Sequence, residues 1–190
     1  MGMISPELRE LLRPALRVNA MLRWILTASI FVYGLAACLV LERSPAPAVV
    51  SELFHLAFGC VAILTGLGSL LVERVLLSDA RLQEAMRSDP DPEALARDPR
   101  RGIVDGERLQ KIQSLTSAER KLLRLCGLFF ASFIIRLSMN EAIAIYGVVL
   151  AFLSRSLIPM LPFAVAAIAL NVACRPRIDP FLERATYLAR

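Results

Sequence analysis

The chain has 190 residues, 56% of them hydrophobic, and a mean hydropathy of +0.58. This apolar content is more than one soluble domain of that length buries, so an ordinary soluble globular protein is excluded. The formal net charge is +5, but the arginines are scattered without interleaved aromatic residues, and we expect no nucleic-acid partner. The composition predicts an integral membrane protein that contacts the lipid bilayer.

Residues 1–21 are predicted to form a cytoplasmic amphipathic segment. Ser5 can cap a helix that begins at Pro6, and Leu8 and Leu12 lie on one side of it. Such a segment either lies on the inner membrane surface or extends the first spanning helix into the cytoplasm. A secretory signal cleaved after Ala46-Pro47-Ala48 is an alternative interpretation of the same region. We expect the first helix to be retained, because its apolar run is long for a signal.

Long uncharged runs predict an all-α membrane protein, since a bilayer span needs about 20 mostly apolar helical residues. We expect four transmembrane helices, at about residues 22–42, 50–76, 122–153 and 157–174. The third should be one long helix, because no proline or glycine lies between Leu128 and Tyr146. The helices pair into two hairpins with a long cytoplasmic loop between helices two and three, giving hairpins at 22–76 and 122–174, a loop at 77–121 and a cytoplasmic tail at 175–190.

Basic residues set the expected orientation. They concentrate near the N-terminus, between Arg74 and Arg124, and from Arg175 onward, whereas the two short opposite loops hold only Arg43 and Arg155. By the positive-inside rule, both termini and the long loop are cytoplasmic. We therefore place the protein in a bacterial inner (cytoplasmic) membrane.

The loop between helices two and three gives mainly local signals. Helix two should continue into VERVLLSDARLQEAMRSD, residues 72–89, because apolar side chains keep helical spacing there. Pro90, Pro92 and Pro99 then favour turns, and Thr116 with Glu119 matches a capping box at the start of helix three. The loop lacks a phosphate-binding glycine motif and a nucleophile elbow, so we expect a solvated connector.

No catalytic or metal-binding cluster is evident in the sequence. The four cysteines lie inside apolar runs at no ligand spacing, and His55 is the only histidine. A zinc or haem site would need further ligands, so we expect no metal, no cofactor and no enzymatic activity.

Small residues recur at helical spacing on two of the predicted helices, which lets neighbouring helices approach closely. On helix two they are Gly59, Ala62, Gly66 and Ser69, and on helix three they are Asn140, Ala144, Gly147 and Ala151. These faces predict close contacts, either within one chain or between copies.

Helix three carries charged residues within its apolar run. Charged side chains near the bilayer centre are costly and normally have partners or a function. Arg136 and Glu141 are about 140° apart around a helix, so each should bond to a different neighbour. Ser138 lies on the Glu141 side and Asn140 on the Arg136 side.

Residues 140–152, NEAIAIYGVVLAF, resemble the carboxylate-bearing helix of the proteolipid c subunit of rotary ATPases. The resemblance implies an ion-binding role for Glu141, with Tyr146 and Gly147 fitting the accompanying pattern. The chain departs from that family in its four expected spans and its long loop. Residues 133–177 also resemble small uncharacterised bacterial membrane proteins, for which no activity is implied.

The sequence favours the first of two functions, and the second is the alternative. In the first, the protein is a non-enzymatic structural or assembly component that packs through helices two and three, as a homo-oligomer or with another membrane subunit. In the second, it is a subunit that translocates protons or cations through the intramembrane carboxyl group of Glu141.

Overall fold

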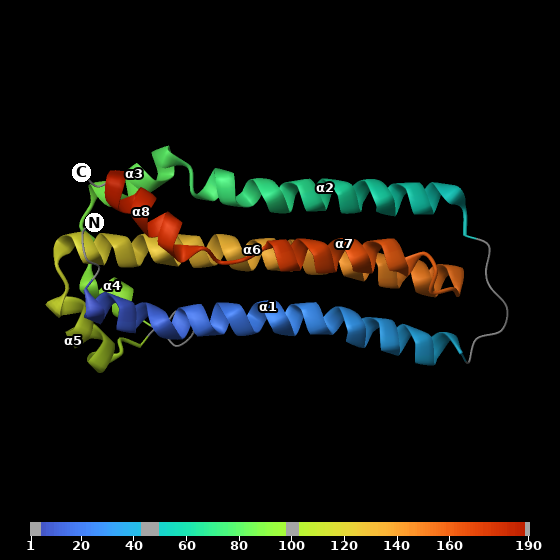
Figure 1. Ribbon diagram of the computed structural model, residues 1–190, viewed down its shortest axis with the longest axis horizontal. Helices are drawn as coiled ribbons and strands as arrows, with labels where there is room; N and C mark the ends of the chain where they lie inside the picture. The colour runs from blue at the N-terminus through green and yellow to red at the C-terminus, as the bar shows by residue number, and fades with distance from the viewer. Residues whose placement is uncertain (1–4, 43–49, 98–102, 189–190) are drawn as a thin grey trace. The chain divides into compact units, whose positions relative to one another are not determined.

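The computed structural model describes residues 5–42, 50–97 and 103–188 (Figure 1). Within these ranges every regular element is a helix, which confirms the predicted all-helical class, and one isolated bridge joins Arg97 to Val104. The helices are α1 (Pro6–Leu41), α2 (Glu52–Leu76), α3 (Asp79–Arg87), α4 (Pro92–Ala96), α5 (Gly106–Ser114), α6 (Ser117–Ser154), α7 (Met160–Ala173) and α8 (Ile178–Leu188). The alternative cleavage site at 46–48, Arg43 and Pro99 lie outside the described residues.

Three helices, α1, α2 and α6, are long and apolar enough to cross a membrane. The fourth apolar run forms α7, which has 14 residues. It passes the same test only when joined to α8 across a bend of 53°. The helix is shorter than the predicted 157–174, because residues 158 and 159 form a turn before it.

The first helix is continuous from Pro6 to Leu41. The hydroxyl oxygen of Ser5 accepts a hydrogen bond from the backbone N–H of Leu8 at 3.2 Å, as the predicted cap requires. Pro14 lies inside the helix without ending it. Residues 6–21 therefore form the first part of the same helix as residues 22–41.

The chain divides into two compact units. Unit 1 comprises Met1–Val18, Val75–Ser132 and Pro176–Arg190, and unit 2 comprises Asn19–Arg74 and Phe133–Arg175. Helices α1, α2 and α6 each contribute residues to both units.

Unit 1 has an apolar core, so the predicted solvated connector is wrong. Leu82, Ile112 and Leu125 are fully buried there, and the rings of Phe129 and Phe181 stack with their centroids 4.9 Å apart. The three short helices α3, α4 and α5 are amphipathic enough to bury one side each in this core.

The predicted continuation of helix two through residue 89 is also wrong. Helix α2 ends at Leu76, and a new helix, α3, begins at Asp79. Ser78 between them has extended backbone angles of φ −64° and ψ 148°, and Leu77 is buried in the core of unit 1. The gain from burying Leu77 and Leu82 outweighs the local preference for one helix.

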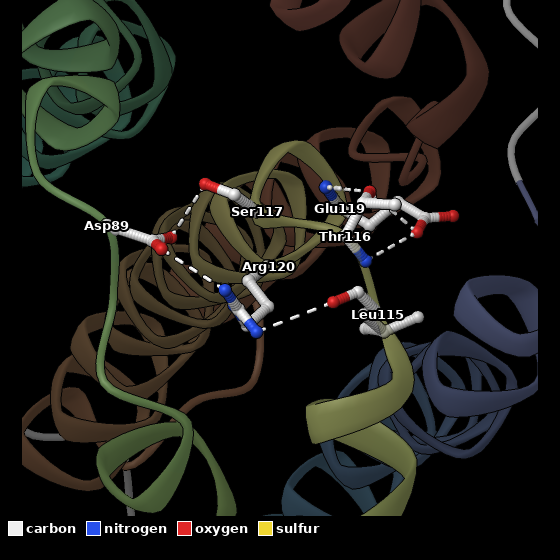
Figure 2. A network of polar contacts seen from close by, with 6 residues as sticks. All are labelled: Asp89, Leu115, Thr116, Ser117, Glu119 and Arg120. Carbon is white, nitrogen blue, oxygen red and sulfur yellow. Dashed lines mark hydrogen bonds and ion pairs between the residues drawn. The ribbon is translucent and has the colours of Figure 1, made fainter.

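The start of α6 is fixed by the predicted capping box, which the structure confirms (Figure 2). The backbone N–H of Thr116 donates to Glu119 Oε2 at 3.0 Å, and the N–H of Glu119 donates to Thr116 Oγ1 at 3.3 Å. Next to the box, Asp89 accepts bonds from the Ser117 hydroxyl at 3.0 Å and from Arg120 Nη2 at 3.1 Å. From this start α6 runs unbroken for 38 residues, as the absence of proline and glycine between Leu128 and Tyr146 predicts.

Unit 2 is a bundle of helical segments from α1, α2, α6 and α7, which run alongside one another (Figure 1). Its buried apolar side chains form three groups along the bundle, centred on Leu137 and Cys174, on Ile30 and Ala167, and on Ala37 and Met160. At the end of α6, Arg155 adopts a φ of 50°, and the N–H of Ser156 donates to the Ala151 carbonyl at 3.1 Å. This left-handed cap turns the chain into α7.

Candidate functional site

Arg136 of α6 forms an ion pair with Glu73 of α2. Both residues belong to unit 2, and the Arg136 side chain is 15% exposed whereas that of Glu73 is 47% exposed. Arg23, Glu73 and Arg136 are all close enough to Cys174 to interact with it electrostatically. These charges therefore mark one level of the bundle, at the end where α6 enters unit 2.

One turn further along α6, hydrogen bonds between one hydroxyl and two amide side chains join three helices. The Ser69 hydroxyl of α2 donates to Asn140 Oδ1 at 2.7 Å, and Asn140 Nδ2 donates to Asn171 Oδ1 of α7 at 3.0 Å. The Ser69 oxygen also lies 3.5 Å from the backbone carbonyl oxygen of Arg136. All three side chains are buried, and Asn171 Nδ2 has no hydrogen-bond partner among the described residues.

Glu141 faces a different neighbour, α1. Its Oε1 atom lies 2.5 Å from the Ser29 hydroxyl oxygen, and the Tyr33 phenol also interacts with the carboxyl group. The side chain is buried, and in the described part of the chain Oε2 has no hydrogen-bond partner. Because Arg136 is paired with Glu73, no ion pair within the described ranges reaches Glu141.

A count of hydrogens around Ser29 bears on the state of Glu141. The Ser29 hydroxyl oxygen lies 2.7 Å from the Leu26 carbonyl oxygen as well as 2.5 Å from Glu141 Oε1. A hydroxyl has one hydrogen to donate, and a carbonyl oxygen has none. If Ser29 donates to Leu26, the hydrogen in the second contact must come from Glu141. A protonated Glu141 gives each contact its own hydrogen, whereas with a carboxylate the two contacts share the single hydrogen of Ser29.

The buried Oε2 atom supports the same state. Leaving an ionised carboxylate oxygen buried without a donor costs much more than leaving the carbonyl oxygen of a neutral acid in that position. The geometry around Glu141 therefore suits a carboxyl group that holds a proton.

The small residues of α2 and α6 are used mainly inside unit 2. An added Cβ at Gly66 would contact Ile143 and Leu170, and one at Gly147 would lie 2.7 Å from Phe163 Cβ. Ala144 and Ala151 are fully buried, and Ala62 packs against the group around Ile143. At Gly59 an added Cβ would meet no atom within 4 Å.

The remaining sequence-predicted residues lie outside these contacts. Ser138 is exposed, and Tyr146 is half-buried with its ring 6.2 Å from that of Phe58. His55 lines one end of an apolar groove of about 570 Å³ between α2 and α7. Over the ranges that the structure describes, no three His, Cys, Asp or Glu side chains gather where they could hold a metal ion.

Sequence reasoning missed the partners Ser29, Tyr33, Glu73 and Asn171. Two weak signals were present. Ser29 and Tyr33 are polar residues one turn apart within an apolar run. Glu73 follows Ser69 by four residues, so it lies on the same face of α2 as the small residues. Asn171 is a single polar residue in an apolar helix, and nothing in its local sequence indicates a partner.

Comparison with protein-family models, with curated proteins and with solved structures finds no match to this chain.

Proposed function

We propose that the protein is a non-enzymatic, four-span protein of a bacterial inner membrane, with both termini and residues 77–121 on the cytoplasmic side. The distribution of arginines supports this orientation. Packing within unit 2 supports α7 as the fourth span. Met160 packs with Ala37, and Cys174 packs in the same group as Leu22 and Leu26. The segment from Met160 to Cys174 thus covers most of the depth that α1 covers between Leu22 and Ala37.

Within this protein, we propose that Glu141 binds and releases a proton inside the membrane. The observation that supports the proposal is the pair of short contacts at Ser29, in which each contact has its own hydrogen only when Glu141 is protonated. The pairing of Arg136 with Glu73 leaves Glu141 without a permanent cation. An intramembrane carboxyl group without a fixed counter-charge can change its protonation state as the pH changes.

A structural role in assembly is the second candidate. It is favoured by the finding that Arg136 bonds to α2, Asn140 to α2 and α7, and Glu141 to α1, and such bonds hold membrane helices together. A second copy or another subunit would meet this chain at positions such as Gly59, where an added Cβ would meet no atom of this chain within 4 Å. In this case Glu141 would be one more contact, and its proton would not exchange.

Carbodiimide labelling of the purified protein in lipid, read by mass spectrometry at each carboxyl group, separates the two functions. The reagent reacts with protonated carboxyl groups in apolar surroundings. A proton-binding Glu141 should be labelled, increasingly so as the pH falls. Glu73 is the internal control, because its side chain is 47% exposed and paired with Arg136, and so lacks the apolar surroundings in which the reagent reacts. Absence of labelling at Glu141 at every pH would favour the assembly role.

Two substitutions extend this experiment. Glu141→Asp keeps a carboxyl group and should retain labelling at this position, whereas Glu141→Gln keeps hydrogen bonding but cannot exchange a proton. If the assembly role is correct, the Glu141→Gln variant should be as stable as the wild type, because it keeps the hydrogen bonding of Glu141. If proton binding is the function, the Glu141→Gln variant should keep the fold but lose proton binding at this position.

A further inference from the structure

The apolar groove between α2 and α7 belongs entirely to unit 2, and its walls are apolar except for His55 at one end. Along α2 it extends from His55 to Leu70, which is about 22 Å at 1.5 Å per residue. Its volume is about 570 Å³. A helix of 10 Å diameter and the same length occupies roughly 1,700 Å³, about three times as much. The groove therefore suits one extended chain and is too small for a whole helix.

Small residues of α2 form one wall of this groove. Gly59, Ala62 and Gly66 all line it, and at Gly59 an added Cβ would meet no atom within 4 Å. In α2, all of whose residues are described, only Ser69 is buried, and Leu67 remains exposed beside the groove. Exposed apolar surface that lines a groove is typical of a binding site for an apolar partner. The small residues of α2 thus leave space beside α7 for such a partner.

His55 gives the groove one polar end. It is half-buried, and within the described ranges its imidazole ring forms no hydrogen bond or ion pair. Glu73 follows His55 by 18 residues on α2, about 27 Å along a helix, which is close to the roughly 30 Å thickness of a hydrocarbon core. If the pair of Glu73 and Arg136 marks one edge of that core, His55 lies at the other edge. There the ester and phosphate oxygens of a phospholipid can accept a hydrogen bond from the imidazole N–H.

We infer that the groove holds one acyl chain of a phospholipid from the leaflet on the His55 side. The ester oxygens lie near His55, and the chain runs along α2 toward Leu70. The apolar walls exclude a polar occupant, because they offer no partner for its hydrogen-bonding groups. The inference rests on the proposed membrane location of unit 2 and is independent of the role of Glu141. The lipid chain fills the space between α2 and α7 and so forms part of the packing of unit 2.

The test uses the full-length protein in vesicles of dioleoylphosphatidylcholine that contain a small fraction of phosphatidylcholine with a photoreactive diazirine in one acyl chain. Mass spectrometry of protein fragments then locates the crosslinks. Crosslinks should be severalfold more frequent at Leu67 and Leu170, which line the groove, than at Leu64 and Leu71, which are exposed on α2 but do not line it. Equal frequencies at the two sets of positions overturn the inference.

The position of the diazirine tests the direction of the chain. A probe that carries it near the ester should crosslink to Pro162 and the first turns of α2, and a probe that carries it near the methyl end should crosslink to Leu70 and Leu170. The reverse order, or the same pattern with both probes, overturns the proposed placement. Release of the protein from cell membranes by sodium carbonate without detergent would instead contradict the membrane location, so the two failures are distinguishable.

A matched pair of variants fills the groove or leaves it open. Gly59→Phe places a ring in the groove and should lower crosslinking at Leu170 severalfold, and Ala166→Phe should do the same from the α7 side. Cys60→Phe adds the same ring at the next position, which is exposed and does not line the groove, and should match the wild type. Unchanged crosslinking in folded Gly59→Phe and Ala166→Phe overturns the inference.

Sedimentation in detergent tests a second copy of the chain as the occupant. The wild type and Gly59→Phe should have the same oligomeric state if the groove holds lipid. A wild-type dimer that dissociates in Gly59→Phe, together with no excess of lipid crosslinks in the groove, assigns the groove to a second copy and overturns the inference.

Discussion

Arg136 is paired with Glu73 of α2, and it makes no ion pair with Glu141, the acid that follows it on its own helix. The guanidinium group therefore neutralises a charge on a second helix. Glu141 is left with the hydroxyl of Ser29 and the phenol of Tyr33. Arg136 and Glu141, the two charged residues of α6 within unit 2, thus bond to different helices, Arg136 to α2 and Glu141 to α1.

Arg136→Gln should lower the free energy of unfolding by about 1–3 kcal/mol, because it leaves Glu73 unpaired in a partly buried setting. Unfolding by sodium dodecyl sulfate in mixed micelles, followed by circular dichroism, measures the change. The control is Arg87→Gln, whose pair with Glu84 has side chains 76% and 71% exposed and should contribute less than about 1 kcal/mol. Equal losses in the two variants would contradict a structural role for Arg136. Combining Glu73→Gln with Arg136→Gln should recover part of the loss.

Asn140→Leu should cost about 1–2 kcal/mol, because the Ser69 donor and the Asn171 acceptor both lose their buried partner. The comparison is Ser138→Ala on the same helix, which removes an exposed hydroxyl and should change stability by less than about 0.5 kcal/mol. The same detergent titration applies. A neutral Asn140→Leu variant would show that the amide chain does not hold α2 and α7 to α6.

Gly147→Ala should destabilise unit 2 by about 1–3 kcal/mol. The new methyl group would lie 2.7 Å from Phe163 Cβ, an atom that cannot move without shifting the backbone of α7. Gly59→Ala is the matched control, since nothing lies within 4 Å of its added Cβ, and alanine there should be neutral or stabilise the helix by up to about 1 kcal/mol. If both variants behave alike in thermal unfolding, α6 and α7 do not approach closely at Gly147.

Ser117→Ala should raise the pKa of Asp89. The hydrogen bond from Ser117, assisted by the bond and charge of Arg120, holds that pKa below its ordinary value of 3.8. A carboxyl group whose pKa is lower in the folded state adds stability above its ordinary pKa and loses it as the pH falls through the folded value. As the pH falls from 3.8 to the folded-state pKa of Asp89, the variant should therefore lose less stability than the wild type.

Carboxyl NMR of Asp89 during an acid titration measures this shift directly. Ser114→Ala is the control, because its hydroxyl bonds the Lys111 carbonyl of its own helix at 2.8 Å and should leave the Asp89 titration unchanged. An Asp89 pKa that is the same in wild type and Ser117→Ala would mean that the contact drawn in Figure 2 does not persist in solution.

Features set by neighbouring residues could be predicted from the sequence. The cap at Ser5, the capping box of Thr116 and Glu119, and the unbroken α6 all depend on residues within a few positions of one another. The apolar runs likewise identified α1, α2 and α6 as long and apolar enough to cross a membrane, because hydropathy over a window needs no tertiary information. The fourth expected span forms the 14-residue α7, which passes that test only together with α8.

Partners distant in the chain could not be predicted. Ser29 and Glu141 are 112 residues apart, and Arg136 and Glu73 are 63 residues apart, so only the packed bundle brings them together. The prediction of where α2 ends was wrong for a related reason. The helical spacing of apolar residues continues through Leu82 because α3 has the same period as α2, and only the burial of Leu77 in the core of unit 1 shows where the helix stops.

The core of unit 1 joins residues from near both ends of the chain, since Leu8 of α1 and Phe181 and Ala185 of α8 are buried together. A ribosome adds roughly 5–20 residues per second, so Leu8 emerges about ten seconds or more before α8. By then α1, α2 and α6 have all been synthesised and can already be inserted. Unit 1 thus closes last during biosynthesis, and a nascent chain stalled before Ile178 would expose this core to chaperones and proteases.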